Sequence, residues 1–395
     1  MIHVYIAGCR GVPMGYGGYE SFVDKLVSYQ QNPNIQYWIA CLPEAKYEQK
    51  RYKRAFCVPI HTPSAGPATM PLMDILALRR FLKMIRAGGA QETSIVYILA
   101  CRIGPFLHHY AKKLHKLGVK VLLNPDGHEW KRGKWSPMIR KYWKLSERLM
   151  VKNADLCVCD SRGIEEYIQS EYAAYSPRTT YISYGANLSA SNCEPERYAE
   201  WCRSHGVQPD SYFLVIGRFV PENNYETIIR EFMASPTQRQ LVILTNASEN
   251  RFMRALREKT GFEKDKRIVF AGTVYEHELV KRIREGAIAY IHGHEVGGTN
   301  PSLLEGLAST PVNILMDVCF NREVGGDAAL YFDKTKGALQ KAIAQAESMT
   351  MEERAAYAEK ARQRILDDYR CEDVSASYEK LFEEISAACI SETAR

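Results

Sequence analysis

The feature that most constrains the fold is an alternation of strand and helix patterns along nearly the whole chain. In the first half, apolar strand-like runs at 3–7, 36–41, 94–100, 120–123 and 155–159 alternate with helical patterns at 21–29, 73–86, 105–117 and 137–152. In the second half, strands at 212–216, 240–244, 268–271 and 287–292 alternate with helices at 225–233, 251–259, 277–285 and 301–308. This order predicts an α/β fold with parallel sheets covered by helices on both faces.

The length of 395 residues predicts two domains, each large enough to bury its own core. We expect two Rossmann-like domains, over 1–190 and 206–365, with the join near the polar stretch 188–209. The tail over 351–388 has the pattern of two helices.

The composition is that of a globular protein, with 46% apolar and 25% charged residues, which excludes a disordered or fibrous chain. No apolar run reaches the roughly 18 residues of a membrane-spanning helix. The N-terminus lacks a basic leader, so we expect a first strand there instead of a signal peptide. The 11 cysteines are scattered without a Cys-x-x-Cys pair, which favours reduced thiols in a cytoplasmic protein over a disulfide scaffold or zinc ribbon.

The charge is uneven: residues 1–190 carry a net +12 and residues 191–395 a net −6. A basic half predicts an anionic partner, which is a nucleic acid, a membrane surface or a phosphorylated substrate. The stretch Lys131–Lys152 has many cations, one carboxylate (Glu147) and the tryptophans Trp135 and Trp143. That composition is typical of a helix lying on anionic lipid.

The same stretch also has the pattern of an ordinary amphipathic helix, with Met138, Tyr142, Leu145 and Leu149 as its packing face. Both interpretations can hold, with the packing face inward and the cations outward. Nucleic-acid binding is disfavoured because the aromatic residues are not spaced as a stacking platform and no DNA-binding motif appears.

Four loops that follow predicted strands carry the residues suited to chemistry. The loop 11–20 is rich in glycine and opens a helix, as a phosphate- or sugar-binding turn does, but it matches neither a dinucleotide fingerprint nor a Walker loop. The loop 124–130 crowds Asp126, His128 and Glu129 at one strand end, where they can hold hydroxyl groups or move a proton, or simply form a capping turn.

The loop 217–224 places Arg218 just past a strand, where a guanidinium can bind a diphosphate. The loop 292–300 runs through a Gly-Gly-Thr-Asn turn into a helix that carries Glu305, and its free N–H groups suit a phosphate. A zinc site from His292, His294 and Glu295 is disfavoured, because ligands so close on a short loop rarely complete a tetrahedron.

Taken in order, these motifs resemble the GT-B glycosyltransferases of family four over nearly the whole chain. The segments 126–132, 160–163 and 321–324 look more narrowly like the bacterial rhamnosyltransferases of capsule and cell-wall polysaccharide assembly. The resemblance implies an acceptor-binding N-terminal domain, a nucleotide-sugar-binding C-terminal domain facing it across a cleft, and a terminal helix over 366–395 that packs back toward the N-terminal domain.

The resemblance also implies a reaction and a set of site residues. It implies a retaining transfer of L-rhamnose from dTDP-L-rhamnose to a lipid-diphosphate-linked GlcNAc or glucose, without metal or cofactor, by a cytoplasmic protein at the inner face of the membrane. The implied donor-binding residues are Gly17, Gly18, Arg218, Asn223, Asn224, Thr273, Val274, His294, Gly298, Thr299, Asn300 and Glu305. The residues implied to line the sugar and acceptor side, as candidate catalytic residues, are Asp126, His128, Asp160 and Tyr184.

The chain departs from the family pattern at two positions. Asn223 stands where a lysine is common, and Gly297 stands where the family often has the first glutamate of its Glu-x7-Glu pattern. We interpret these as a changed donor pocket, which fits a deoxysugar with one hydroxyl fewer. The alternatives are a hexosyltransferase that uses a UDP-sugar and a sugar-nucleotide epimerase, which can share the two-domain architecture.

Overall fold

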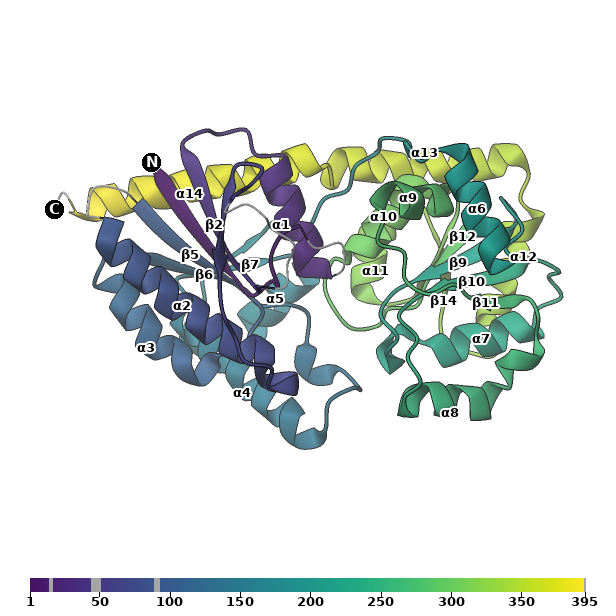
Figure 1. The fold of residues 1–395 in the computed structure, drawn as a ribbon, viewed down its shortest axis with the longest axis horizontal. Coiled ribbons are helices and arrows are strands. Elements are labelled where there is room, and N and C mark those ends of the chain that lie inside the picture. The colour runs from purple at the N-terminus through teal and green to yellow at the C-terminus, as the bar shows by residue number, and fades with distance from the viewer. Residues whose placement is uncertain (14–16, 44–50, 89–92, 394–395) are drawn as a thin grey trace. The chain divides into compact units, whose positions relative to one another are not determined.

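The computed structural model describes residues 1–13, 17–43, 51–88 and 93–393. Its contacts divide the chain into two compact units. Unit 1 consists of Met1–Trp130, Trp135–Gly185 and Cys371–Arg395, and unit 2 of Lys131–Lys134 and Ala186–Arg370. Each unit holds one sheet with helices on both faces (Figure 1).

The described part of unit 1 contains an eight-stranded sheet of order β3-β4-β2-β1-β5-β6-β7-β8, parallel except for the β3–β4 pair. Its strands are β1 (Ile2–Ala7), β2 (Ile35–Cys41), β3 (Arg51–Tyr52), β4 (Ala55–Pro59), β5 (Thr93–Leu99), β6 (Lys120–Asn124), β7 (Leu156–Cys159) and β8 (Thr179–Tyr181). Its helices are α1 (Gly18–Ser28), α2 (Thr69–Gly88), α3 (Gly104–His115), α4 (Pro137–Asn153), α5 (Arg162–Glu171) and α14 (Cys371–Thr393). The chain winds outward from β1 in one direction and then from β5 in the other, so a topological switch point lies between these strands.

Helices α2, α3, α4 and α5 cover one face of this sheet, and α1 and α14 cover the other (Figure 1). The C-terminal helix α14 is fixed there by polar contacts as well as by packing. The Tyr378 hydroxyl lies 3.1 Å from that of Tyr97 on β5, and the Glu379 carboxylate accepts hydrogen bonds from the backbone of Gln31 and Asn32 after α1. The last segment of the sequence is therefore part of the first unit.

Helix α4 turns a different face inward from the one its apolar residues predict. Met138, Tyr142 and Leu145 are 81%, 37% and 40% exposed, so the predicted packing face is wrong. The buried stripe includes Ser146 and Glu147 instead.

Both of these buried polar side chains have partners. Ser146 accepts a hydrogen bond from the backbone of Gly104, and Glu147 accepts from the hydroxyls of Tyr167 and Tyr172. Polar residues can lie inward where they are satisfied in this way, and hydropathy does not reveal such pairing.

The described part of unit 2 contains a six-stranded parallel sheet of order β11-β10-β9-β12-β13-β14. Its strands are β9 (Tyr212–Ile216), β10 (Gln240–Leu244), β11 (Ile268–Phe270), β12 (Ala287–His292), β13 (Asn313–Met316) and β14 (Leu330–Phe332). Its helices are α6 (Pro195–His205), α7 (Tyr225–Ala234), α8 (Arg251–Thr260), α9 (His277–Glu285), α10 (Pro301–Ser309), α11 (Cys319–Gly325), α12 (Ala338–Ser348) and α13 (Met351–Asp368). The switch point lies between β9 and β12, which brings the loops after those two strands together.

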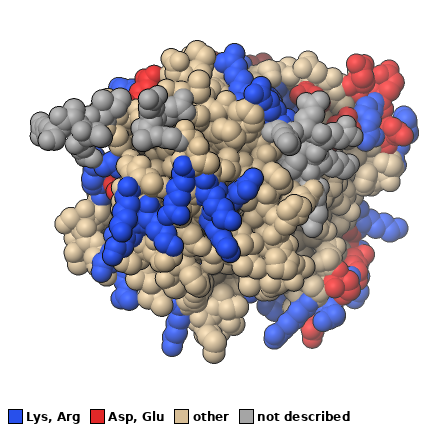
Figure 2. Space-filling model, turned by 60° about the vertical axis from the view of Figure 1, so that its left-hand side comes forward, with Lys and Arg blue, Asp and Glu red and all other residues tan. Residues whose placement is uncertain are grey.

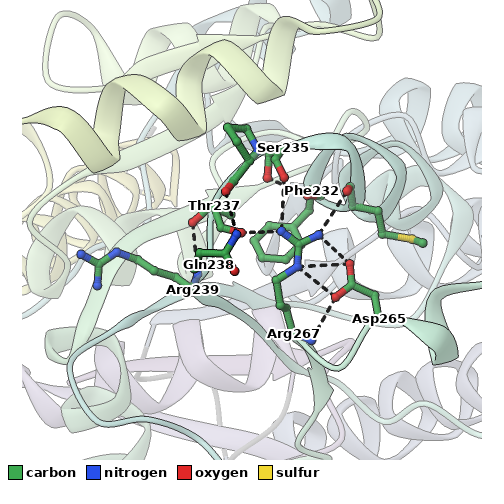
Figure 3. Close-up of polar contacts among 9 residues, drawn as sticks. Phe232, Ser235, Thr237, Gln238, Arg239, Asp265 and Arg267 are labelled. Atoms are coloured by element: carbon green, nitrogen blue, oxygen red, sulfur yellow. Dashed lines mark hydrogen bonds and ion pairs between the residues drawn. The ribbon is translucent and has the colours of Figure 1, made fainter.

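Helices α7, α8 and α12 pack on one face of the second sheet, and α6 and α9 on the other. At the amino end of β11, Arg267 ties the sheet to the end of α7 (Figure 3). Its guanidinium pairs with Asp265 and donates to the backbone carbonyls of Met233, Ser235 and Thr237. This cluster lies at the opposite end of the strands from the loops described below, so it supports the sheet and not the site.

No helix within the described residues is long and apolar enough to cross a membrane.

Candidate functional site

In unit 1, the glycine-rich loop after β1 leads directly into α1. Gly17 caps the helix with φ of 134°, and Gly18 is exposed as the first helical residue. The Glu20 carboxylate turns back and accepts a hydrogen bond from the backbone N–H of Arg10, 2.8 Å away, which holds the two ends of the loop together. Residues 14–16 of the predicted loop lie outside the described residues.

Beneath this loop, the half-buried Arg102 lies beside the buried Asp74. Its guanidinium donates to the carbonyl of Gly8 at 2.8 Å and to the Asp74 carboxylate at 3.2 Å. Burial raises the pKa of Asp74 to about 6, and the Arg102 charge acts against that shift. Arg102 therefore links the ends of β1 and β5 at the switch point, although no sequence motif marked it.

A polar cluster lies at the carboxyl end of β6, with the buried Asn124 at its centre. The Asn124 amide donates to the Tyr184 hydroxyl at 3.2 Å, and its carbonyl oxygen accepts from the backbone N–H of Asp126 at 3.0 Å and from the Tyr19 hydroxyl at 3.5 Å. The Asp126 side chain closes its own turn by accepting from the backbone of Gly127. Two of the predicted residues, Asp126 and Tyr184, thus meet through an asparagine that the prediction left out.

Asp160, at the end of β7, belongs to the same electrostatic cluster. Burial first, and then the nearby Asp160 carboxylate, raise the pKa of Tyr184 well above its ordinary value. Burial and the charge of Asp126 do the same for the pKa of Tyr19. Both phenols therefore stay protonated at neutral pH, and they act as neutral hydroxyls that donate or accept hydrogen bonds.

His128 lies beside a second cluster. Its ring is 4.2 Å from that of Tyr167 between centroids and 6.0 Å from that of Trp130. Tyr167 shares the buried Glu147 carboxylate with Lys144, and burial raises the pKa of Glu147. The ring of His128 thus lies against α5 and against Trp130 of its own loop.

In unit 2, the loop after β9 presents Arg218 to solvent. Within the described residues of unit 2, its guanidinium makes no hydrogen bond or ion pair, whereas its backbone is held firmly. The Asn223 amide donates to the Arg218 carbonyl at 2.8 Å, and the Asn224 amide donates to the carbonyl of Gly293 at 2.9 Å. Both asparagines are buried, so their amides brace the loop and leave Arg218 available.

The last residue of β12, His292, and His294 in the loop after it have stacked imidazoles, with ring centroids 4.2 Å apart and nearly parallel planes. Burial and the charge of Arg284 lower the pKa of His292 to about 3. Burial, the neighbouring imidazole, and the charges of Arg218 and Arg132 lower the pKa of His294 well below its ordinary value. Both rings are therefore neutral at pH 7, and the buried Nδ1 of His294 has no hydrogen-bond partner in the described part of the chain.

Gly217 explains why the two loops of unit 2 can meet. A Cβ at this position would lie 2.9 Å from His294 Cε1, closer than real Cβ atoms approach, and 3.1 Å from Asn223 Nδ2, which is unusually tight. The glycine is therefore required for close packing between the loop after β9 and the loop after β12. This packing sets the backbone of Arg218 beside His294.

The start of α10 is held by a buried arginine from the end of α9. Arg284 donates to the Ser302 hydroxyl at 3.1 Å and pairs with the Glu305 carboxylate at 2.9 Å. Asn300 caps the helix through its side chain, which accepts from the backbone of Ser302, and Thr299 is buried just before it. Arg284 thus fixes the orientation of Glu305, and the sequence carried no signal for it.

The remaining predicted residues of unit 2 lie in glycine-containing turns. Thr273 and Val274 are half-buried after Gly272, which has a φ of 69°, and Val274 packs against the core of α6 and α9. Gly298 is buried. Gly297 has a φ of 147°, and a Cβ there would meet nothing within 4 Å.

No group of three His, Cys, Asp or Glu side chains that could hold a metal ion occurs among the described residues. The arrangement in unit 2 is instead that of an anion site: one exposed guanidinium, a helix N-terminus and neutral imidazoles at the carboxyl ends of β9 and β12. Such a site can bind phosphate groups and stabilise negative charge as it develops.

Comparisons with known families agree with this geometry. Residues 199–364 match the family described as glycosyl transferases group 1, and residues 1–187 match a domain of unknown function, DUF1972. The chain is a GT-B glycosyltransferase. Both its α/β fold and its two Rossmann-like sheets are confirmed.

Solved structures of low sequence identity share the fold of this glycosyltransferase. Sucrose-phosphate synthase from Thermosynechococcus elongatus matches with a TM-score of 0.75 at 16% identity, over 98% of this chain and 99% of that one. A glycosyltransferase from Rickettsia africae matches with a TM-score of 0.72 at 13% sequence identity, over 97% of this chain and 98% of that one. HepE from Anabaena, in complex with UDP, matches with a TM-score of 0.69 at 10% sequence identity, over 97% of this chain and 100% of that one. No curated protein gives a match.

Proposed function

We propose that this glycosyltransferase transfers L-rhamnose from dTDP-L-rhamnose to a lipid-diphosphate-linked sugar, GlcNAc or glucose. The observation that carries the nucleotide-sugar part is the exposed Arg218 guanidinium after β9. Strand β9 pairs with β12, the strand whose following loop leads into α10. A nucleoside diphosphate supplies the two or three negative charges that such a site can bind.

The reaction demands stabilisation of the leaving group. As the anomeric bond breaks, negative charge grows on the diphosphate and positive charge on the sugar ring. Arg218 and the first N–H groups of α10 stabilise the leaving diphosphate because they are already oriented before the charge appears. Glu305, oriented by Arg284, binds the ribose, and the turn at Thr273 and Val274 receives the base.

The proposal for the donor sugar rests on the surroundings of Gly297. The position has no side chain and open space around its would-be Cβ, so no carboxylate reaches a sugar hydroxyl from there. A sugar that lacks one hydroxyl fits this pocket best. The neutral His294 ring offers its buried Nδ1 to another hydroxyl of the sugar.

The acceptor is proposed to bind unit 1. Asp126, Asp160 and Tyr184 supply hydroxyl-binding groups at the carboxyl ends of β6 to β8, and His128 extends this region toward Tyr167.

A lipid-linked acceptor requires the enzyme to reach a membrane, and the surface of unit 1 has the charge for it. Helices α2, α3 and α4 carry eleven Lys and Arg and two carboxylates, Asp74 and Glu147. Both carboxylates are buried. Figure 2 shows Lys and Arg side chains side by side on one face with no acidic side chain between them.

The exposed side of α4 adds apolar contact to this charge. Met138, Tyr142 and Leu145 alternate there with the exposed cations Lys141 and Arg148. This combination suits peripheral contact of Lys131–Lys152 with anionic lipid at the inner face of the membrane, because the exposed cations of the stretch reach the headgroups while the exposed apolar side chains enter the interface.

A second donor, a UDP-hexose, is favoured by one observation: the similar HepE structure contains UDP. The test offers dTDP-rhamnose and UDP-glucose separately to the purified protein, with lipid-diphosphate-linked GlcNAc or glucose and a chelator present. Rhamnosylated lipid is the expected product, at a rate that the chelator does not change. Transfer from UDP-glucose alone would replace the rhamnosyl proposal, and loss of turnover with chelator would contradict a metal-free site.

A further inference from the structure

The short segment Lys131–Lys134 packs with unit 2, although the residues on both sides of it belong to unit 1. Within it, Arg132 is only 6% exposed, whereas Lys131 and Lys134 are exposed. A buried guanidinium between exposed lysines has a specific place in the structure, because desolvating an arginine is costly unless a counter-charge receives it.

That counter-charge is the buried Glu222, in the loop that carries Arg218. Arg132 Nη1 lies 3.7 Å from Glu222 Oε1, an ion pair too long for a hydrogen bond. The next residue, Gly133, packs on the same turn: a Cβ there would lie 3.9 Å from that of Pro221. The segment is therefore seated directly on the short helical turn Pro221–Asn223 that follows Arg218.

Arg132 and Arg218 act on the same imidazole. Both positive charges lower the pKa of His294, which lies against Gly217 at the start of the Arg218 loop. The loop 217–224 itself supplies a single cation, since Asn223 is uncharged and its amide is turned to the Arg218 carbonyl. Arg132 thus brings a second cation to this loop from a distant part of the sequence.

We propose that Arg132 is a second diphosphate-binding residue of the donor site, held in position by Glu222. This role rests on the proposed nucleotide-sugar donor. Two guanidinium groups against one carboxylate, beside neutral histidines, leave a net positive site for a diphosphate. The 3.7 Å ion pair lets Glu222 balance the charge of Arg132 when the diphosphate binds.

The competing explanation is that Arg132 only neutralises Glu222, and a pair of substitutions separates the two roles. Arg132→Met alone leaves a buried carboxylate without its ion pair and can disturb the loop. The double variant Arg132→Met/Glu222→Gln removes both charges together and keeps similar side-chain volumes. Glu222→Gln alone and Arg362→Met, an exposed arginine on α13, are the matched controls.

The measurement is calorimetric binding of UDP, dTDP and UMP to the full-length protein and its variants. The double variant is expected to bind the better diphosphate about ten- to a hundredfold more weakly than Glu222→Gln does, with a smaller loss for UMP. Diphosphate affinity equal to that of Glu222→Gln would overturn the role of Arg132. A wild-type protein that binds neither diphosphate would contradict the donor proposal and this role with it.

Discussion

The substitution Arg218→Ala tests the donor site most directly, because the structure separates its effect on catalysis from its effect on folding. Arg218 is exposed, and its guanidinium has no partner in the described residues of unit 2. Removing it leaves no buried group unsatisfied, so we expect the free energy of unfolding to change by less than about 0.5 kcal/mol. The Asn223 amide still holds the backbone carbonyl of residue 218, which keeps the loop in place.

In the proposed reaction, the same side chain faces a leaving group whose charge grows. A charge-assisted hydrogen bond contributes about 1.5–3 kcal/mol, and removing one preorganised donor to a developing anion typically lowers kcat by about 10²–10³-fold. We therefore expect Arg218→Ala to lower kcat by that factor with an unchanged Tm, and Arg218→Lys to recover part of the loss.

The assay is the initial rate of sugar transfer at saturating donor, with Arg362→Ala as the control for a lost surface arginine. A kcat within about threefold of wild type would show that Arg218 does not bind the diphosphate. A large fall in Tm would show that the loop depends on the guanidinium, against the hydrogen bonds described here.

Three further substitutions test other parts of the structure. Arg267→Ala leaves Asp265 and three backbone carbonyls without their donor, so urea unfolding should show that the free energy of unfolding falls by about 2–4 kcal/mol. An unchanged urea midpoint would contradict the view that Arg267 ties the sheet to α7. Burial raises the pKa of Asp74 to about 6, so the folded protein binds this proton at a higher pH than the unfolded chain does, and the free energy of unfolding falls as pH rises from about 4 to 6. Asp74→Asn should flatten that part of the curve of unfolding free energy against pH, and an unaltered slope would refute the pKa shift. Lys141→Glu/Arg148→Glu should lower sedimentation with anionic liposomes at least tenfold at low salt, whereas equal binding would remove α4 from the membrane contact.

Most of the fold could be predicted because a strand or helix that is buried on one side shows a regular spacing of apolar residues in the sequence. The strands around β1 and β9 and the helices that connect them were expected within a few residues. The prediction missed the strands β3, β4, β8, β13 and β14 and the helices α5, α6, α11 and α12. Helix α6 occupies much of the predicted join at 188–209. In α4 the pattern was present but misleading, since Ser146 and Glu147 are buried through partners on α3 and α5.

The loops of the candidate site were predicted because parallel strands bring their carboxyl ends to one edge. Asp126 and Tyr184 in unit 1, and Arg218 and His294 in unit 2, do lie near one another within their units. Asn223, which holds the Arg218 loop, was predicted as a donor-binding residue, whereas Asn124 and Arg284 were not predicted. Arg284 is an ordinary cation at the end of a helix, and nothing in its sequence neighbourhood shows that it is buried against Glu305.

Each unit holds an arginine next to a loop of the candidate site, half-buried in unit 1 and buried in unit 2. In unit 1, Arg102 joins the carbonyl of Gly8 to Asp74, and in unit 2, Arg284 joins Ser302 to Glu305. Each arginine comes from an element outside the motif that it supports, and each is held by one carboxylate, so its charge is balanced before any ligand arrives. The loops of the candidate site can therefore keep a fixed shape while their own polar groups remain available to the proposed donor and acceptor. A substitution of either arginine should consequently reduce turnover by disordering a loop whose own sequence is intact.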